Sequence, residues 1–420
     1  MQDKLIRKKI VTTVHSNKKI IENYFFMTVL QVINSLFYLL IYPFLIRVLG
    51  ADSYGHYVFA MSITNFFITF VSFGFELPAM KAIAQNQMDV DIKTNVLSCV
   101  FTGKIYIEVL AFIIYFILIT LVPVLRQDWI LLSICFINTL SNIIFPNWYF
   151  QGMQKMQVVT FIQLAFRLFS LPFIFLIIRD PADVLIFAFI TTLTNIGGGA
   201  VAAHIIHFKE KLHIHWMPIF KLKIWYKDAL PFFWSTALSS IKYQSISVIL
   251  GSFFRMSDVA LYDLAYKIIS IPNILFGSIN GALFPKIAKD NNKKIIKRIF
   301  KFETLAGIFV ILIVTLLGRW IIIFLGGSEM LGAYQIAVVM SFGVLTLLLV
   351  GGYINFIFVP QKKYNLVLQN QIVAFCVFFT LIGLGLIICK SILSFAIAWS
   401  TAGIFEIFYC KILIKRHKLF

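Results

Sequence analysis

Four basic residues of this sequence stand inside long apolar runs, where a charge is costly and therefore informative. They are Lys104, Arg167, Lys242 and Lys267. An ionisable side chain near the centre of a bilayer costs about 2.5–3.5 kcal/mol on insertion scales, so such residues usually face a bundle interior or a wet cavity. Arg167 and Lys242 have no acid three or four positions away, so each needs a partner on another helix, water or a ligand. These two are the better candidates for binding an anion.

Lys267 and Lys104 each have an acid at helical spacing. Asp263 precedes Lys267 by four positions, which is the favourable order for an intrahelical pair, whereas Lys104 precedes Glu108 in the less favourable order. The simplest interpretation of both is a salt bridge that lowers the cost of burial. The alternative is a site in which bases bind an anionic group while acids titrate, coupled to a proton or a sodium ion.

The rest of the chain must supply a membrane-embedded scaffold for these charges. Of its 420 residues, 60% are hydrophobic and only 13% are charged. A helix needs roughly 20 apolar residues to cross a hydrocarbon core, and backbone groups in lipid must bond within their own segment. The sequence predicts about twelve such helices, although a count of eleven or thirteen also fits. They are expected at 21–47, 54–83, 96–121, 129–150, 158–178, 184–206, 229–253, 259–284, 302–325, 331–358, 364–389 and 392–414.

The net charge of +19 indicates topology rather than a nucleic-acid partner. If the N-terminus is cytoplasmic, most of the Lys and Arg residues fall in cytoplasmic segments, as the positive-inside rule requires. The same bases attract anionic membrane lipid. We therefore expect a multi-pass protein with no nucleic-acid partner, a basic cytoplasmic segment at 1–20 and a cytoplasmic tail at 415–420.

The chain divides into two halves that are weakly related. The longest connection, a cytoplasmic linker at 208–228, separates a predicted six-helix bundle at 21–207 from a second at 229–414. "SYGHYVFAMSI" after Asp52 and "VALYDLAYKII" after Asp258 carry tyrosine and small residues at similar steps. Transporter folds commonly contain such repeats, with the substrate site at their interface. No loop is long enough for a soluble catalytic domain, which favours transport over an enzyme.

Motifs for catalysis or metal binding are weak. "DVD" at 89–91 lies in a short loop without the α/β domain that a sugar-nucleotide transferase needs. His204 and His207 share a helix face, but no carboxylate or cysteine completes a metal site. We predict no catalytic residues, no metal and no bound cofactor apart from a coupling H⁺ or Na⁺.

Three segments carry a family resemblance. "LIRVLGADSYGHYVFA" at 45–60, "FPNWYFQGMQKM" at 145–156 and "GALFPKIAKD" at 281–290 are similar to segments of the polysaccharide-biosynthesis flippases for lipid-linked O-antigen repeat units. These belong to the superfamily of multidrug, oligosaccharidyl-lipid and polysaccharide exporters. The resemblance implies an all-α integral membrane protein, with two six-helix bundles around a central cavity, in the bacterial inner membrane.

The resemblance also implies a cargo and a direction. The cargo is an oligosaccharide repeat unit on undecaprenyl pyrophosphate, moved from the cytoplasmic to the periplasmic leaflet by alternating access for O-antigen or capsule synthesis. In that setting Arg167, Lys242, Lys267 and Lys104 would neutralise the pyrophosphate. Asp263 and Glu76 would be the ion-coupling acids, and an antiport mechanism is expected. Membrane lipid and other polysaccharide-assembly proteins are the expected partners.

A cation-coupled exporter of drugs or other small molecules, from the same superfamily, is the alternative. Such an exporter would favour acids in its cavity with few lone bases, so Arg167 and Lys242 argue against it. A membrane enzyme such as a polymerase of the same sugars would normally need a large outer loop. A channel or scaffold without turnover is a third alternative. The sequence favours the flippase.

Overall fold

The computed structural model describes residues 2–290, 293–361 and 363–419, and every regular element within them is helical. The structure does not describe the side chains of the motif at 281–290 or of the basic segment at 1–20. Among the described residues, ten segments are long and apolar enough to cross a membrane. The predicted class, an all-α multi-pass membrane protein, is confirmed.

The first two expected helices are joined into one element, α1 (Gln2–Ser72), which is bent at Gly50. Gly50 has φ 76° and ψ 164°, a backbone conformation that side chains with a Cβ rarely adopt. The second expected helix, 54–83, is itself interrupted after Ser72, because Phe73 and Gly74 have φ values of 43° and 71°. The chain resumes as α2 (Glu76–Gln85), so Glu76 is the first residue of a new helix. A predicted span at 54–83 is therefore two helices with a break between them.

The structure divides into two compact units, which combine residues from distant parts of the chain. Unit 1 comprises 1–37, 64–178 and 185–237, and unit 2 comprises 38–63, 179–184 and 238–420. The predicted bundles at 21–207 and 229–414 stay a prediction. Residues 38–63, on both sides of the bend at Gly50, belong to unit 2 together with the C-terminal half of the chain.

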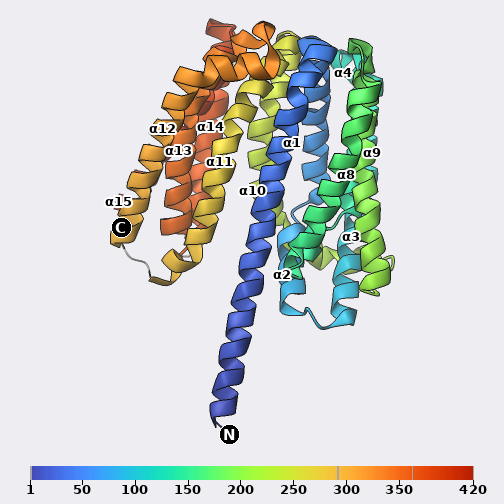
Figure 1. Ribbon diagram of the computed structural model, residues 1–420, viewed down its shortest axis with the longest axis vertical. Helices are drawn as coiled ribbons and strands as arrows, with labels where there is room; N and C mark the ends of the chain where they lie inside the picture. The colour runs from blue at the N-terminus through green and yellow to red at the C-terminus, as the bar shows by residue number, and fades with distance from the viewer. Residues whose placement is uncertain (1, 291–292, 362, 420) are drawn as a thin grey trace. The chain divides into compact units, whose positions relative to one another are not determined.

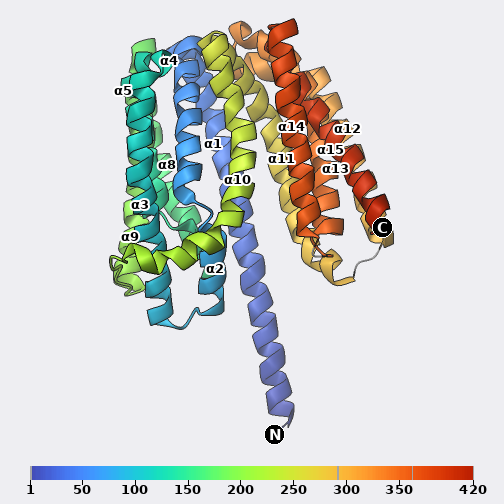
Figure 2. The ribbon, with the colours of Figure 1, turned by 180° about the vertical axis from the view of Figure 1, so that it is seen from behind.

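Unit 1 contains the elements that follow α2, shown from cyan to yellow-green in Figures 1 and 2. They are α3 (Val90–Leu121), α4 (Pro123–Gln127), α5 (Trp129–Phe136), α6 (Asn138–Ile144), α7 (Asn147–Gly152), α8 (Met156–Ile177), α9 (Val184–His204) with a following π-helical turn (Ile205–Lys209), and the first part of α10 (Ile219–Phe253). A 3-10 turn (Pro181–Asp183) precedes α9 and belongs to unit 2.

The fourth expected span, 129–150, is broken into α5, α6 and α7. Phe145 is extended, with φ −98° and ψ 90°, because the residue before a proline is pushed out of the helical region, and Pro146 follows it. Asn138 donates a hydrogen bond back to the Cys135 carbonyl at 3.0 Å, at the junction of α5 and α6. These breaks leave amide side chains and backbone groups inside a membrane-embedded unit, where lipid could not satisfy them.

The predicted linker, 208–228, packs against α3. The His215 and Met217 N–H groups donate to Ser98 Oγ at 2.9 Å and to Thr102 Oγ1 at 3.2 Å. The Tyr226 hydroxyl donates to the Gly103 carbonyl at 2.9 Å. Helix α10 begins at Ile219, ten residues before the predicted start at 229, so its first part belongs to this packed segment (Figure 2).

Unit 2 is built mainly from the C-terminal helices. They are the second part of α10, α11 (Met256–Asp290), α12 (Lys293–Gly326), a 3-10 turn (Ser328–Leu331), α13 (Gly332–Tyr353), a π-helical turn (Ile354–Phe358), α14 (Tyr364–Ile388) and α15 (Leu393–His417). Helix α13 packs against α11, α12 and α15, and α14 packs against α15 (Figure 1). Small residues allow close approach: Gly403 of α15, for example, packs against Thr346 of α13.

We predict that Gly55→Ala destabilises the protein. Gly55 of α1 lies so close to the start of α11, within unit 2, that a Cβ would overlap the Met256 carbonyl. Overpacking of this kind costs about 1–3 kcal/mol, which a thermal unfolding curve of the purified protein should register as a lower Tm. The matched control is Gly277→Ala in α11, where a Cβ meets no atom within 4 Å. An unchanged Tm for Gly55→Ala would contradict this close packing.

Candidate functional site

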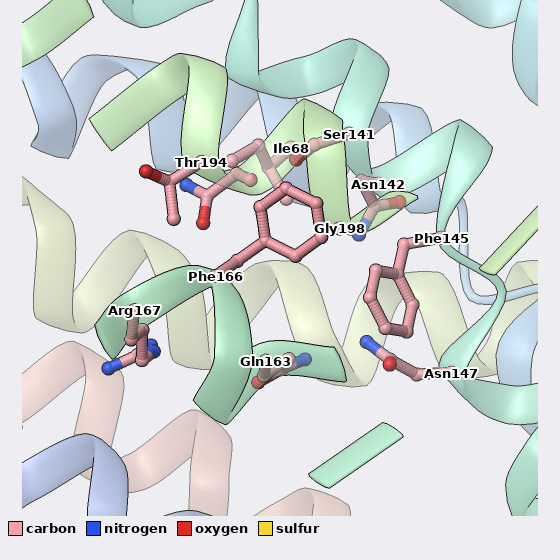
Figure 3. Close-up of a pocket in the computed structure, with 11 residues that line it drawn as sticks. Ile68, Ser141, Asn142, Phe145, Asn147, Gln163, Phe166, Arg167, Thr194 and Gly198 are labelled. Carbon is pink, nitrogen blue, oxygen red and sulfur yellow. The ribbon is translucent and has the colours of Figure 1, made fainter. Parts of the chain in front are cut away.

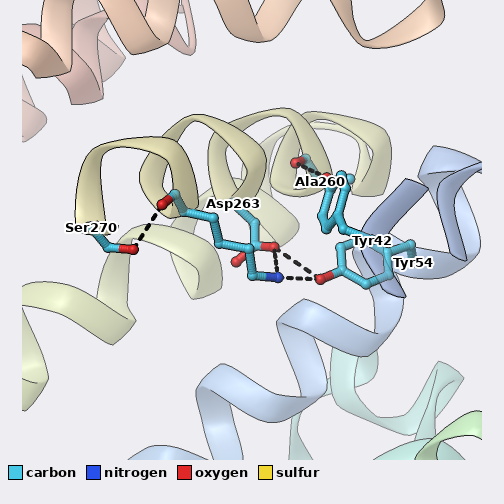
Figure 4. A network of polar contacts seen from close by, with 6 residues as sticks. Tyr42, Tyr54, Ala260, Asp263 and Ser270 are labelled. Atoms are coloured by element: carbon cyan, nitrogen blue, oxygen red, sulfur yellow. Dashed lines mark hydrogen bonds and ion pairs between the residues drawn. The ribbon is translucent and has the colours of Figure 1, made fainter. Parts of the chain in front are cut away.

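Asp263 and Lys267 form the ion pair that their spacing predicts. On α11, Lys267 Nζ lies 2.6 Å from Asp263 Oδ2. The Tyr54 hydroxyl of α1 donates to the same carboxylate oxygen at 3.0 Å and accepts a hydrogen bond from Lys267 (Figure 4). The exposed fractions of the two charged side chains are only 22% for Lys267 and 16% for Asp263. The acid and the base therefore compensate each other inside unit 2.

Tyrosine rings surround the Lys267 ammonium. Its Nζ lies 5.2, 5.0 and 5.1 Å from the ring centroids of Tyr38, Tyr42 and Tyr54. The Tyr42 hydroxyl donates to the Ala260 carbonyl at 3.4 Å, which fixes one of these rings against α11. A desolvated cation–π contact contributes about 2 kcal/mol. A ligand anion would have to compete with a carboxylate and three ring faces for this base.

Lys242 finds its partner on another helix. Its Nζ on α10 donates to Glu406 Oε1 of α15 at 3.0 Å, and both side chains are largely buried. Asn370 of α14 donates to the other carboxylate oxygen at 3.4 Å. The Phe378 ring centroid lies 5.8 Å from Lys242 Nζ. Lys242 is therefore part of a polar cluster that joins three helices of unit 2. The sequence alone could not identify Glu406 as its partner.

Lys104 is held by the broken segments of unit 1. With only 1% of its surface exposed, it donates to the Asn142 carbonyl at 3.2 Å and to Asn142 Oδ1 at 2.8 Å. Ser72 also donates to Asn142 Oδ1 at 3.0 Å, and Glu76 Oε1 lies 3.6 Å from Lys104 Nζ. The expected pair between Lys104 and Glu108 does not form. The helix breaks bring Asn142 and Glu76 to Lys104, and Glu108 bonds elsewhere.

Two buried acids have neutral partners, and sequence reasoning did not single them out as sites. Glu108 Oε1 of α3 accepts from Thr139 Oγ1 at 2.5 Å, and Glu303 Oε1 of α12 accepts from Asn280 Nδ2 at 2.8 Å. Neither Oε2 atom has a hydrogen-bond partner among the described residues. Glu303 lies at the start of the span expected at 302–325, but it is well inside α12, which begins at Lys293. The only local signal was an acid within an apolar run.

Arg167 lines a polar cavity of about 240 Å³ inside unit 1. Its guanidinium carbon lies 5.0 Å from the centroid of the Phe37 ring. The cavity is also lined by Phe145 and Phe166, whose rings face the same space in Figure 3. Its other polar lining consists of four amides and two hydroxyls: Asn142, Asn147, Gln163, Asn195, Ser141 and Thr194. Sequence reasoning identified Arg167 but none of these six neighbours, which come from α6, α7, α8 and α9.

The six predicted site residues thus fall into three groups. Within unit 1, Asn142 connects the Lys104 and Glu76 pair to the Arg167 cavity, since it contacts Lys104 and lines the cavity. Within unit 2, Asp263 and Lys267 form one cluster and Lys242 belongs to another. Across the described residues, no group of three or more His, Cys, Asp or Glu side chains is arranged to hold a metal ion.

We predict that Asp263→Asn destabilises the protein by about 2 kcal/mol, because it leaves a partly buried ammonium without its charged hydrogen-bond partner. Adding Lys267→Met should restore most of the loss, since the second change removes the uncompensated charge. Thermal unfolding of the wild type, both single variants and the double variant forms the required cycle. Losses that simply add in the double variant would contradict a functional ion pair at this position.

Comparison with known proteins places the chain in a family. A family described as "Polysaccharide biosynthesis protein" matches residues 20–291. The putative O-antigen transporter of Escherichia coli (strain K12) is 27% identical over 266 residues, covering 63% of this chain. The putative O-antigen transporter of Shigella dysenteriae is 23% identical over 267 residues, covering 61% of this chain. Each match spans 64% of the relative's own length.

Solved structures share the fold. The lipid II flippase MurJ, in an inward closed conformation, has a TM-score of 0.69 at 16% identity, covering 92% of this chain and 87% of that one. A multidrug resistance MATE family transporter of the MOP superfamily, in an inward-facing conformation, has a TM-score of 0.64 at 13% identity, covering 91% of this chain and 99% of that one. At these identities the likeness concerns the fold alone. The family match covers well over half of the sequence, and the chain therefore belongs to the polysaccharide biosynthesis protein family.

Proposed function

We propose that the protein is a flippase for a lipid-linked oligosaccharide. It moves a repeat unit on undecaprenyl pyrophosphate from the cytoplasmic to the periplasmic leaflet of the bacterial inner membrane, by alternating access, for O-antigen or capsule synthesis. The O-antigen transporter names of its relatives and the fold it shares with a lipid II flippase support this proposal. The proposed activity is transport rather than catalysis, and the oligosaccharide and membrane lipid are its molecular partners.

The observation that carries the proposal is the Arg167 cavity. A pyrophosphate is too costly to bring into a low-dielectric interior unless cationic hydrogen-bond donors neutralise it, and a guanidinium binds phosphate oxygens through two parallel bonds. Arg167 provides such a donor beside amides and hydroxyls that suit the polar part of the cargo. Lys104, Lys242 and Lys267 are secondary candidates, because none of them is among the residues that line this cavity.

The same cavity argues against export of cationic drugs. A cation would be stabilised by carboxylates, but the described residues that line the cavity include an arginine and no acid. An apolar drug that covered the half-buried Gln163 amide would leave it without hydrogen bonds, at a cost of about 1–3 kcal/mol. The flippase is therefore the better fit to this cavity.

We also propose that transport is coupled to an ion. The contacts of each acid indicate which one is the best candidate to bind a coupling proton. Asp263 and Glu406 each accept a hydrogen bond from a lysine, so the loss of either carboxylate would break an ion pair. Glu76, which is 48% exposed in its side chain, lies beside Lys104. Glu303 is 1% exposed and has only a neutral amide partner within the described residues. Because a buried carboxyl beside neutral groups is most cheaply held protonated, we propose Glu303 as the first proton-binding candidate, ahead of Asp263.

Transfer of a lipid-linked oligosaccharide should depend on the protein and on Arg167. In proteoliposomes containing the full chain, we expect an oligosaccharide on undecaprenyl pyrophosphate to become accessible to an external glycosidase faster than in protein-free vesicles. Arg167→Gln should slow this transfer by about tenfold or more, because it removes a charged hydrogen-bond donor worth about 1.5–3 kcal/mol. The matched control is Arg319→Gln, which alters an exposed arginine of α12.

Two outcomes would contradict this prediction. Transfer by the Arg167→Gln protein at the wild-type rate would remove Arg167 from the substrate site and leave the flippase standing. If the folded protein transferred the lipid no faster than empty vesicles but did transport a cationic dye, the exporter would become the better proposal than the flippase.

A proton gradient should act through Glu303. If an imposed pH gradient accelerates transfer, Glu303→Gln should abolish the acceleration, because the amide resembles a permanently protonated carboxyl and cannot exchange a proton. Asp263→Asn should keep the gradient dependence once its lower stability is taken into account. A sodium gradient at constant pH provides the control for the identity of the ion. The reverse pattern, with dependence lost only in Asp263→Asn, would return the coupling role to Asp263.

A further inference from the structure

The amide-lined cavity of unit 1 offers hydrogen-bond donors and acceptors that the protein itself leaves unused. Lys104 and Ser72 both donate to Asn142 Oδ1, so the Asn142 Nδ2 group remains available as a donor. Asn195 has the opposite arrangement, because its Nδ2 donates to Asn138 Oδ1 at 2.9 Å and its Oδ1 remains available as an acceptor.

Two further amides keep all of their donors and acceptors available. The side chains of Asn147 and Gln163 make no hydrogen bond within the described part of the chain, and both line the cavity. Each amide carries one acceptor and two donors. The unused groups of the cavity are therefore a mixture of donors and acceptors, distributed over α6, α7, α8 and α9.

This mixture selects a class of ligand. A phosphate or carboxylate alone would need donors only, and a cation would need acceptors only. A sugar hydroxyl both donates and accepts, so a ring that bears several hydroxyls uses both kinds of group at once. Phe145 and Phe166 face the same space and provide apolar surface for the C–H groups of such a ring (Figure 3).

The cavity is small, which suits a single sugar ring rather than a whole repeat unit. Pockets for drug-sized molecules are typically about 300–1,000 Å³, and this cavity of about 240 Å³ is smaller. Asn147 and Asn195 are exposed, so the cavity can be reached from the surface of the unit. Arg167 places a positive charge beside the amides, where a sugar attached to an anionic group would carry that group.

We propose that this cavity binds one sugar residue of the lipid-linked cargo, the one joined to the pyrophosphate, with the amides on its hydroxyls and Arg167 on the phosphate. The inference rests on the proposed flippase function and adds a sugar subsite to it. Lys104 acts as a positioning residue in this subsite, because its bond to Asn142 Oδ1 turns the Asn142 Nδ2 group into a donor for the ligand.

The test compares binding of two kinds of probe to the full chain in lipid nanodiscs. The first is bare undecaprenyl pyrophosphate, and the second is the same lipid bearing glucose, galactose or N-acetylglucosamine. We expect at least one sugar-bearing lipid to bind about fivefold or more tightly than the bare lipid, as one or two added hydrogen bonds would produce. Gln163→Leu should remove that preference, so that the sugar-bearing and the bare lipid bind with about equal affinity. Arg167→Gln should weaken binding of both lipids.

Controls separate the subsite from the rest of the protein. Gln157→Leu changes an exposed glutamine six positions earlier on α8, outside the cavity lining, and should keep the preference. Asn147→Ala provides a second cavity variant at an exposed position, in case Gln163→Leu fails to fold. An unchanged sugar preference in folded cavity variants, or equal wild-type affinity for all the lipids, would overturn the sugar subsite alone. If the folded wild type bound neither kind of lipid, the flippase proposal would fail together with it.

Discussion

The polar interior of this protein depends on one constraint, which is that a charge surrounded by apolar helices must be compensated within a few ångströms. Each buried base meets the constraint differently. Lys267 uses a carboxylate and three tyrosine rings, Lys242 uses a carboxylate on a distant helix, and Lys104 uses mainly an amide. Two helix breaks serve the same constraint, one before Glu76 and one after Asn142. They bring polar groups to Lys104 that continuous helices would direct elsewhere.

The acids inside the two units are compensated in two different ways. A carboxylate that accepts from lysine stabilises its partner, and its protonation would leave that base uncompensated. Asp263 and Glu406 are of this kind. A carboxyl that meets only a hydroxyl or an amide can gain or lose a proton without disturbing an ion pair. Glu108 and Glu303 are of this second kind within the described residues, one in each compact unit.

The cavity of unit 1 shows how a break in a helix can create a binding surface. Pro146 and the extended Phe145 end α6, so Asn142, Phe145 and Asn147 can contribute to one lining that an unbroken helix would distribute around its circumference. Asn142 also contacts Lys104, so a residue outside the lining helps to determine which end of that amide faces the cavity.

The sequence by itself determined the membrane class, the approximate helices and the Asp263–Lys267 pair. These follow from local rules, since the length of an apolar run decides whether a helix spans and the helical period places residues i and i+4 on one face. Only the tertiary structure decided that Lys242 meets Glu406, 164 positions away, or that Lys104 prefers Asn142 to the nearby Glu108. It also assembled the amides around Arg167 from four helices. Helical periodicity fixes contacts along one helix, whereas the choice of facing helices depends on the packing of the whole unit.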